Sequence, residues 1–319
     1  MPEFDHIPVL PAETLAALRP APGETYADAT AGLGGHAALM APALGPSGII
    51  ILNDVDPANL DRARARVTST PGGPSTVHTT AGNFADLPRR IADLGRPADL
   101  LLADLGFSSN QMSDPARGFS FMRDGPLDMR LDPSLRTSAA DLVNTLPERE
   151  LARILRDLGE EPASNAIAKR IVLERKSSPI TSTAQFADIV RSAVGRRGTD
   201  RIDPSTRSFQ ALRIAVNDEL GVLDALLTRI ADEARALSSG QPGRWLRPGA
   251  RVAVISFHSL EDRPVKQAMA RWVGEGWAEF ITNGAIAPSE TKVRENPRAR
   301  SAKLRAVRLG RVTDAQRFV

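Results

Sequence analysis

The chain has 319 residues, of which 42% are apolar, and a formal net charge of +3. This length is enough for one large domain or two medium ones, each with a hydrophobic core. No apolar run approaches the ~18 residues that a membrane span needs, and the N-terminus lacks the charged and apolar regions of a signal peptide. We therefore expect a cytoplasmic protein.

Cysteine is absent, which excludes disulfides, thiolate nucleophiles and metal sites with cysteine ligands. The four histidines are too widely scattered to predict a zinc site; they are His6, His36, His78 and His258. The sequence therefore gives no reason to expect a metal.

Charge is distributed unevenly along the chain. Residues 1–110 carry 7 basic and 12 acidic side chains, a net charge of −5, so the remaining residues carry +8. Residues 169–213 contain 10 basic and 4 acidic side chains, and residues 292–311 contain 8 basic side chains against Glu295 alone. Such runs are often only solvated faces, but arginine also grips phosphates bidentately and stacks on bases. The pattern favours a polyanionic substrate, either RNA or DNA.

In chain order, the first strong signal lies in residues 25–56. A strand at 25–29 leads into the turn GLGGH, which contains Gly34, Gly35 and His36; a helical run follows, and a second strand at 48–52 precedes Asp54. Glycines allow close approach of a ligand, and a helix N-terminus favours anionic groups. A carboxylate about 20 residues after such a turn accepts hydrogen bonds from ribose hydroxyls. The stretch predicts an adenosine-binding βαβ unit.

The same turn leaves the cofactor open. A dinucleotide site would read G-x-G-x-x-G, and GLGGH supplies only part of that spacing. S-adenosylmethionine carries adenosine without a pyrophosphate and needs the acid for its ribose equally. The spacing favours the methyl donor over a nicotinamide dinucleotide, with a purely structural glycine turn as the third interpretation.

The next strands also end in polar residues. A helix is predicted at 58–67 with Pro57 at its first position, and a strand at 75–80 is followed by Asn83 and Phe84. A buried strand at 99–104 ends in Asp104 and precedes a loop of small polar residues at 105–111. Ligands bind at the carboxyl ends of parallel strands. We therefore expect Asn83 and Phe84 to flank an adenine ring, with a place in the core as the alternative for Phe84, and Asp104 to line the site.

The middle of the chain is predicted to be helical. Residues 117–130 form an irregular segment of aromatic, basic and acidic residues. Helices are predicted at 151–158, 166–176, 184–194 and 209–237, with a basic loop at 195–204. A strand returns at 251–257 and precedes His258, with a capping box of Ser259 and Asp262 for a helix at 260–272. Residues 304–309 alternate as a terminal edge strand does.

This order predicts a split domain. Residues 1–110 and 240–319 would form an α/β cofactor-binding domain, and residues 111–239 would be a mostly helical insert that carries much of the positive charge and grips the substrate.

Several blocks of sequence identify a family. The turn ending in Gly34-Gly35-His36 is accompanied by DLGFSSNQ (104–111), RGFSFMRDGPLDMR (117–130), RSFQALRIAVNDEL (207–220), SFHSLEDR (256–263) and ENPRAR (295–300). Together they resemble the RsmH family, also called MraW, over nearly the whole chain. These are bacterial S-adenosylmethionine-dependent methyltransferases of 16S ribosomal RNA. The resemblance implies a class I methyltransferase (Rossmann-like) sheet with an inserted helical domain for rRNA recognition.

The resemblance also implies a reaction, methylation of the N4 amine of one cytidine in the decoding region of 16S rRNA, on the small ribosomal subunit. Its motifs assign cofactor contacts to Gly34, Gly35, His36, Asp54, Phe84, Asp104 and Gln111. Asp104 or Ser108 would accept a hydrogen bond from the amine. Arg123, Arg130, Arg207, Arg213 and His258 are expected at the substrate, and a homodimer is allowed.

Three classes of function follow from these observations. The first is an rRNA amino-methyltransferase, with a DNA cytosine methyltransferase as its variant. The second is a nicotinamide-dependent oxidoreductase, which the turn and the DLGFSSNQ block disfavour. The third is a non-catalytic nucleic-acid-binding protein, which only the basic stretches support.

Overall fold

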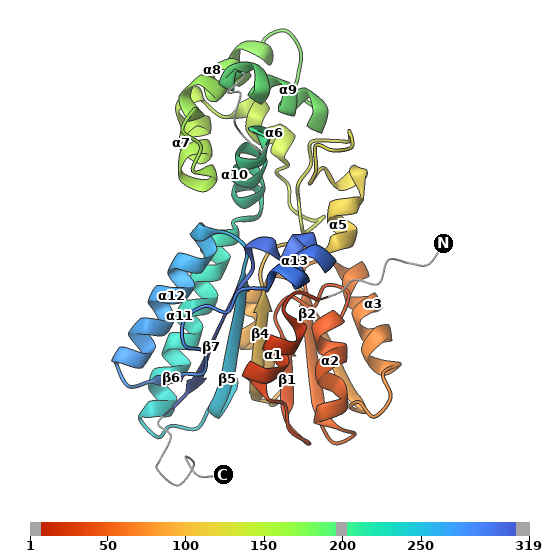
Figure 1. The fold of residues 1–319 in the computed structure, drawn as a ribbon, viewed down its shortest axis with the longest axis vertical. Coiled ribbons are helices and arrows are strands. Elements are labelled where there is room, and N and C mark those ends of the chain that lie inside the picture. The colour runs from red at the N-terminus through yellow and green to blue at the C-terminus, as the bar shows by residue number, and fades with distance from the viewer. Residues whose placement is uncertain (1–7, 196–202, 311–319) are drawn as a thin grey trace. The chain divides into compact units, whose positions relative to one another are not determined.

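A computed structural model describes residues 8–195 and 203–310 of the chain (Figure 1). The chain divides into two compact units, one of residues 1–106 and 220–319, the other of residues 107–219. Within the described ranges, no helix is both long and apolar enough to cross a membrane. His6, most of the basic loop predicted at 195–204, and Arg311 lie outside those ranges.

The first unit is built on a seven-stranded sheet in the order β3-β2-β1-β4-β5-β7-β6. Its strands are β1 (Thr25–Asp28), β2 (Ile49–Asp54), β3 (Thr76–Ala81), β4 (Ala98–Asp104), β5 (Leu246–Ser256), β6 (Ala278–Phe280) and β7 (Lys303–Leu309). β1 to β5 pair in parallel, whereas β7 runs antiparallel between β5 and β6. This arrangement confirms the class I methyltransferase sheet expected from the sequence.

Helices cover both faces of this sheet because side chains along a strand alternate between faces. Ile51 and Leu101 point into one core with α4 (Leu87–Asp93), α11 (Glu219–Ser238) and α12 (Ser259–Gly274). Ile50 and Leu52 point into the other core with α1 (Pro11–Leu18), α2 (Gly35–Leu44) and α3 (Pro57–Thr68). The unit also contains η1 (Phe84–Asp86), α13 (Glu290–Glu295) and η3 (Pro297–Ser301).

The structure corrects the predicted helix at 209–237. Two helices replace it, α10 (Ser205–Asn217) and α11, because Asp218 adopts a left-handed φ of 48° and ends α10. The boundary of the insert moves accordingly, from residue 239 to Glu219. Its physical reason is that Leu226 and Ile230 of α11 are buried in the core of the sheet.

The second unit is helical, with a core of its own. It contains α5 (Ser109–Ser113), η2 (Pro115–Arg117), α6 (Ala139–Thr145), α7 (Glu148–Gly159), α8 (Ser164–Glu174), α9 (Thr183–Val194) and α10. The core is formed by Leu155 of α7, Ile171 of α8, Phe186 of α9 and Phe209 of α10, among others. This unit has no strand within its described residues beyond an isolated bridge between Pro126 and Ser182.

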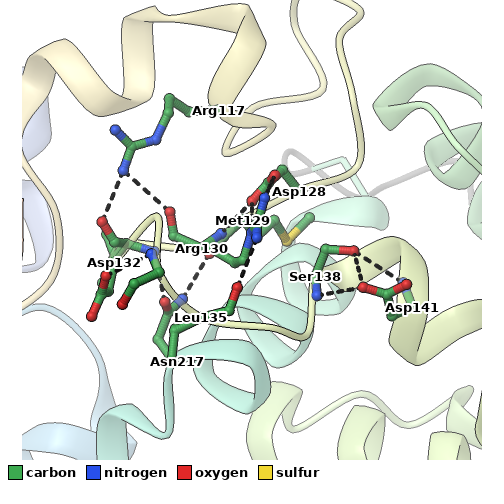
Figure 2. Close-up of polar contacts among 11 residues, drawn as sticks. Arg117, Asp128, Met129, Arg130, Asp132, Leu135, Ser138, Asp141 and Asn217 are labelled. Carbon is green, nitrogen blue, oxygen red and sulfur yellow. Dashed lines mark hydrogen bonds and ion pairs between the residues drawn. The ribbon is translucent and has the colours of Figure 1, made fainter.

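A dense hydrogen-bond network fixes the irregular segment of the second unit (Figure 2). The Asn217 side chain donates to the Met129 carbonyl at 2.8 Å and accepts from the Leu131 amide at 2.7 Å. Arg117 donates to the carbonyls of Arg130 and Leu131, while the Arg130 guanidinium binds both oxygens of Asp128 at 2.8 and 2.6 Å. Met129 holds a left-handed φ of 63° at the centre of these bonds. These bonds therefore fix the conformation of the segment within the second unit, although its sequence shows no helical or strand period.

Candidate active site

The glycine turn is shaped by packing as much as by access. Gly34 precedes α2 with a φ of 74°, a conformation that side chains disfavour. A Cβ there would lie 2.8 Å from Cα of Ala63 in α3. Gly34 is therefore required by the close approach of α3 to the turn, a reason that the sequence alone did not reveal.

Asp54 ends β2 and ties that strand to the turn. Its side chain is buried, and its oxygens accept the Gly32 amide at 2.8 Å and the Asp56 amide at 2.9 Å. Burial raises the pKa of the Asp54 carboxyl, and these two amides partly offset the increase. A carboxylate has about four acceptor positions, so Asp54 can still accept ribose hydroxyls.

Two further carboxylates flank His36 at the same edge of the sheet. Asp104 ends β4, and its Oδ2 lies 3.6 Å from Nε2 of His36, the second residue of α2. Asp28 ends β1, where its oxygens accept the Tyr26 hydroxyl at 2.9 Å and the Thr30 amide at 3.2 Å. Burial raises the pKa of Asp28 to about 6, against the lowering effect of nearby His36. The three side chains form one electrostatic group.

Polar atoms of this group are left unsatisfied. His36 is 6% exposed, and neither of its ring nitrogens has a hydrogen-bond partner among the described residues. Oδ1 of Asp104 is likewise buried without a partner in that part of the chain. Buried polar atoms are almost always bonded, so these atoms are available to a polar ligand.

Phe84 lies beyond the end of β3, in the short helix η1. Its half-buried ring packs against the core under the sheet. Asn83 caps η1 through a bond from the Ala85 amide to its side-chain oxygen. Because part of the Phe84 ring is still accessible, its predicted place beside an adenine stays compatible with its packing role.

Ser108 and Gln111, predicted at the same site, belong to the second unit. They form a capping box at the start of α5, in which Oε1 of Gln111 accepts the Ser108 amide at 3.0 Å. Gln111 is 4% exposed. The observed bond gives this glutamine a structural function in shaping the loop, and its cofactor contact stays a prediction.

The four arginines predicted to bind the substrate differ in how many hydrogen bonds and ion pairs they form within the protein. Arg130 is bound to Asp128, and Arg213 forms a bidentate pair with Glu219 at 2.8 and 2.9 Å while lying over the Phe107 ring. Arg207 is exposed and makes one long bond, 3.4 Å, to a carbonyl. The side chain of Arg123 is exposed and has no hydrogen bond or ion pair among the described residues.

His258 follows β5 and precedes α12. Its Nε2 lies 3.2 Å from Glu261. The predicted capping box of Ser259 and Asp262 is wrong: His258 is the N-cap residue, and the Asp262 carboxylate instead pairs with Lys303 and Arg305. Those cations hold the pKa of Asp262 below its usual value against the effect of burial.

The sequence analysis missed Asp28. The signal was present, because the TYAD strand ends in an acid just before the glycine turn, as β2 and β4 end in Asp54 and Asp104. With Asp28 included, three buried or half-buried carboxylates line one edge of the sheet. Such a site disfavours a pyrophosphate and suits a ligand with ribose hydroxyls and positive charge, as S-adenosylmethionine has.

Comparisons with known proteins agree with this chemistry. Residues 3–309 match the model of the MraW methylase family. The chain is 44% identical to the ribosomal RNA small subunit methyltransferase H of Geobacter sulfurreducens, over 95% of this chain and 98% of the relative. It is also 44% identical to the protein of the same name from Thermomicrobium roseum, over 94% and 92% of the two chains.

Two solved structures that the chain resembles share less of its sequence. An rRNA methylase from Streptococcus thermophilus is 9% identical with a TM-score of 0.41, over 94% of this chain and 93% of that one. The fibrillarin of Aeropyrum pernix, solved with bound S-adenosyl-L-methionine, is 12% identical with a TM-score of 0.37, over 92% and 74%.

Proposed function

The chain belongs to the MraW methylase family, and from that premise we propose that it methylates the N4 amine of one cytidine in the decoding region of small-subunit ribosomal RNA. It is an S-adenosylmethionine-dependent methyltransferase. The printed name of the relatives supports the rRNA substrate. The observation that carries the chemistry is that Oδ1 of Asp104, at the end of β4, is buried and has no hydrogen-bond partner among the described residues.

We assign Asp104 as the hydrogen-bond acceptor for the amine that receives the methyl group. When bound, the cofactor supplies a methyl group on a positively charged sulfur. The N4 amine of cytosine is a poor nucleophile because its lone pair is conjugated with the ring. A carboxylate oxygen that accepts an N–H bond from this amine localises the lone pair, and Oδ1 of Asp104 has no competing partner among the described residues. The Ser108 hydroxyl is the second possible acceptor.

His36 and Asp28 are assigned to orientation. Nε2 of His36 lies 3.6 Å from Oδ2 of Asp104, so we assign the other oxygen, Oδ1, to the amine. Asp28 is fixed by Tyr26 and Thr30, so its charge is held beside His36 without freedom to turn. Much of the acceleration can then come from positioning, which contributes ~7–11 kcal/mol in favourable cases.

The helical unit, residues 107–219, is assigned to rRNA recognition. Its exposed Arg123 and Arg207 are available for phosphates, whereas the internal pairs of Arg130 and Arg213 indicate that these two arginines stabilise the unit first. The target base must leave its stack to enter an enzyme site, and contacts to the flanking backbone would hold the rest of the strand. Gln111 and His258 remain assigned to the cofactor and the substrate.

The test is transfer of labelled methyl from S-adenosylmethionine to small ribosomal subunits that lack decoding-region methylation, followed by mapping of the labelled nucleotide. We expect the label on the N4 of a cytidine. Label at another atom would overturn the proposed position, and transfer to DNA instead of rRNA would overturn the substrate. Saturable binding of NAD without binding of S-adenosylmethionine would restore the oxidoreductase interpretation.

A further inference from the structure

A short tip of the helical unit, residues 122–123, exposes both of its side chains. Aromatic side chains anchor the residues that precede it. Phe119 is buried and stacked on Phe107, with 5.1 Å between ring centroids. Phe121 packs edge-on against Phe209 at 4.9 Å. The backbone that enters the tip is thereby fixed to the core of the unit.

The C-terminal side of the tip is fixed as firmly. Oδ1 of Asp124 accepts the amides of Ala184 and Gly125, each at 3.0 Å, at the start of α9 and within its own turn. The Ala184 amide is the largest of the bonds that lower the pKa of this carboxyl, so Asp124 stays ionised in place. A Cβ on Gly125 would lie 2.0 Å from the Pro115 carbonyl, so the exit of the tip admits only glycine.

Between these anchors the chain presents an apolar side chain and a cation to solvent. Met122 is 82% exposed, the highest value among the exposed large apolar side chains of the described residues. The neighbouring Arg123 is exposed and has no hydrogen bond or ion pair in that part of the chain. An anchored loop that holds a methionine in water gains nothing for its own stability, which suggests that the exposed pair serves binding.

We propose that Met122 is a wedge that packs against or between bases of the rRNA, while Arg123 binds the adjoining phosphate. This inference deepens the proposed function and rests on it. Apolar side chains such as Met and Leu are used as wedges that unstack bases, and an enzyme that extracts a base has to stabilise the disturbed stack that remains. The anchoring on both sides matters because a mobile loop would lose conformational entropy on binding, and that cost would offset the free energy of the contact with the bases.

The experiment compares Met122→Ala with Leu173→Ala, a matched control. Leu173 belongs to α8 of the same unit and is 54% exposed. We expect Met122→Ala to raise the KM for small subunits and the Kd for a decoding-region RNA about tenfold, as for loss of one base-stacking side chain. Leu173→Ala should change neither, and S-adenosylmethionine affinity and Tm should stay at the wild-type values in both. Met122→Leu should restore wild-type binding, because it keeps an apolar wedge.

A 2-aminopurine scan of the RNA locates the contact. Binding of wild-type protein should raise the fluorescence of one base, and Met122→Ala should remove that increase. Arg123→Gln should weaken binding at every sequence and reduce the salt slope by about one.

Three results separate the possibilities. Equal effects of Met122→Ala and Leu173→Ala would overturn the wedge. A loss seen with whole subunits but absent with protein-free RNA would mean that the tip contacts a ribosomal protein. If wild-type protein binds the RNA through Met122 but transfers no methyl group, the proposed function fails while the contact stands.

Discussion

Two polar regions of this molecule differ in whether their bonds are complete. At the carboxyl edge of the sheet, both nitrogens of His36 and Oδ1 of Asp104 are buried without partners among the described residues. In the segment around Met129, the side chains of Asn217, Arg117 and Arg130 are bonded to carbonyls, amides and a carboxylate (Figure 2). Both regions are rich in charged residues, so polarity alone does not distinguish a binding site from a structural network.

The two regions differ in whether their hydrogen bonds are completed within the protein or by a ligand. A completed network stabilises the folded unit, and removing one partner leaves another buried group unbonded. An incomplete group costs stability in the free protein and regains it when a ligand binds. Substitutions in the two regions should therefore have opposite signatures, with activity lost in one and stability lost in the other.

The largest effect is expected at Asp104. Asp104→Asn removes the charge beside His36 and weakens the acceptor for the amine, so kcat should fall by about 10²–10³. The Tm should stay level or rise, because a buried charge with an unbonded oxygen is lost. Methyl transfer in single turnover and thermal unfolding are the measurements.

Asp99 provides the control for that substitution. It lies at the opposite end of β4 and accepts the Thr25 amide at 2.9 Å. Asp99→Asn should leave kcat within about twofold of wild type, since its distance from the reacting group makes only indirect effects available. Near-normal methylation by Asp104→Asn would remove Asp104 from the reaction.

The next effect concerns the pH dependence of stability. Burial raises the pKa of Asp28 from 3.8 to about 6. The folded state thus binds this proton more tightly than the unfolded state. The stabilisation that the bound proton gives to the folded state is full below pH ~4 and is lost as the pH rises through ~6. Asp28→Asn should stabilise the protein at pH 7 by about 2–3 kcal/mol relative to wild type, with the difference vanishing near pH 4. A difference that is constant with pH would contradict this assignment.

The same titration should appear in cofactor binding. A cationic ligand binds the ionised Asp28 more tightly, so the Kd for S-adenosylmethionine should rise about tenfold per pH unit below pH 6. Calorimetry between pH 5 and 8 measures this slope. Asp28→Asn should bind more weakly at pH 7 and lose the slope, whereas a slope that persists in this variant would assign the titration to another group.

Much of the fold was predictable because its signals are local. The acids that end β2 and β4, the glycine turn and Pro57 at the start of α3 follow from patterns of a few residues. The break at Asp218 was not predictable in this way, since residues on both sides of it keep a helical period. The left-handed conformation of Asp218 ends α10, and α11 then packs against the sheet.

The candidate site shows the same limit. The sequence predicted that Asp54 and Asp104 follow strands and that His36 follows the glycine turn, and the structure has all three residues at the carboxyl edge of the sheet. It did not reveal that Arg213 is paired with Glu219, or that Gly34 is required by Ala63, because both depend on residues that folding brings together. A motif marks a residue as constrained, and the three-dimensional contacts decide whether a ligand or the fold imposes the constraint.

A smaller effect is expected in the bonded network. Asn217→Ala removes bonds to the Met129 carbonyl, the Arg213 carbonyl and the Leu131 amide, and should destabilise the helical unit by about 1–3 kcal/mol. The affinity for S-adenosylmethionine should not change. Urea unfolding and calorimetry test both statements. An unchanged midpoint would show that water replaces these bonds, and that the network is not what fixes the segment.

The smallest effect extends the comparison to surface charge. Arg298 and Arg300 of η3 are exposed and have no ion pair among the described residues, whereas Arg213 is paired inside the helical unit. We expect that arginines without an ion pair are the ones that bind RNA. The double variant Arg298→Gln and Arg300→Gln should then lower the magnitude of the salt slope of rRNA binding by about one or two, because each phosphate contact contributes about 0.7–0.9. Arg213→Gln should instead lower the Tm, because it leaves Glu219 unpaired, and should change the slope little. Anisotropy titrations at several salt concentrations give the slopes. An equal loss of slope in the two variants would mean that Arg213 exchanges Glu219 for RNA, and that the pairs seen in the free protein do not predict its RNA contacts.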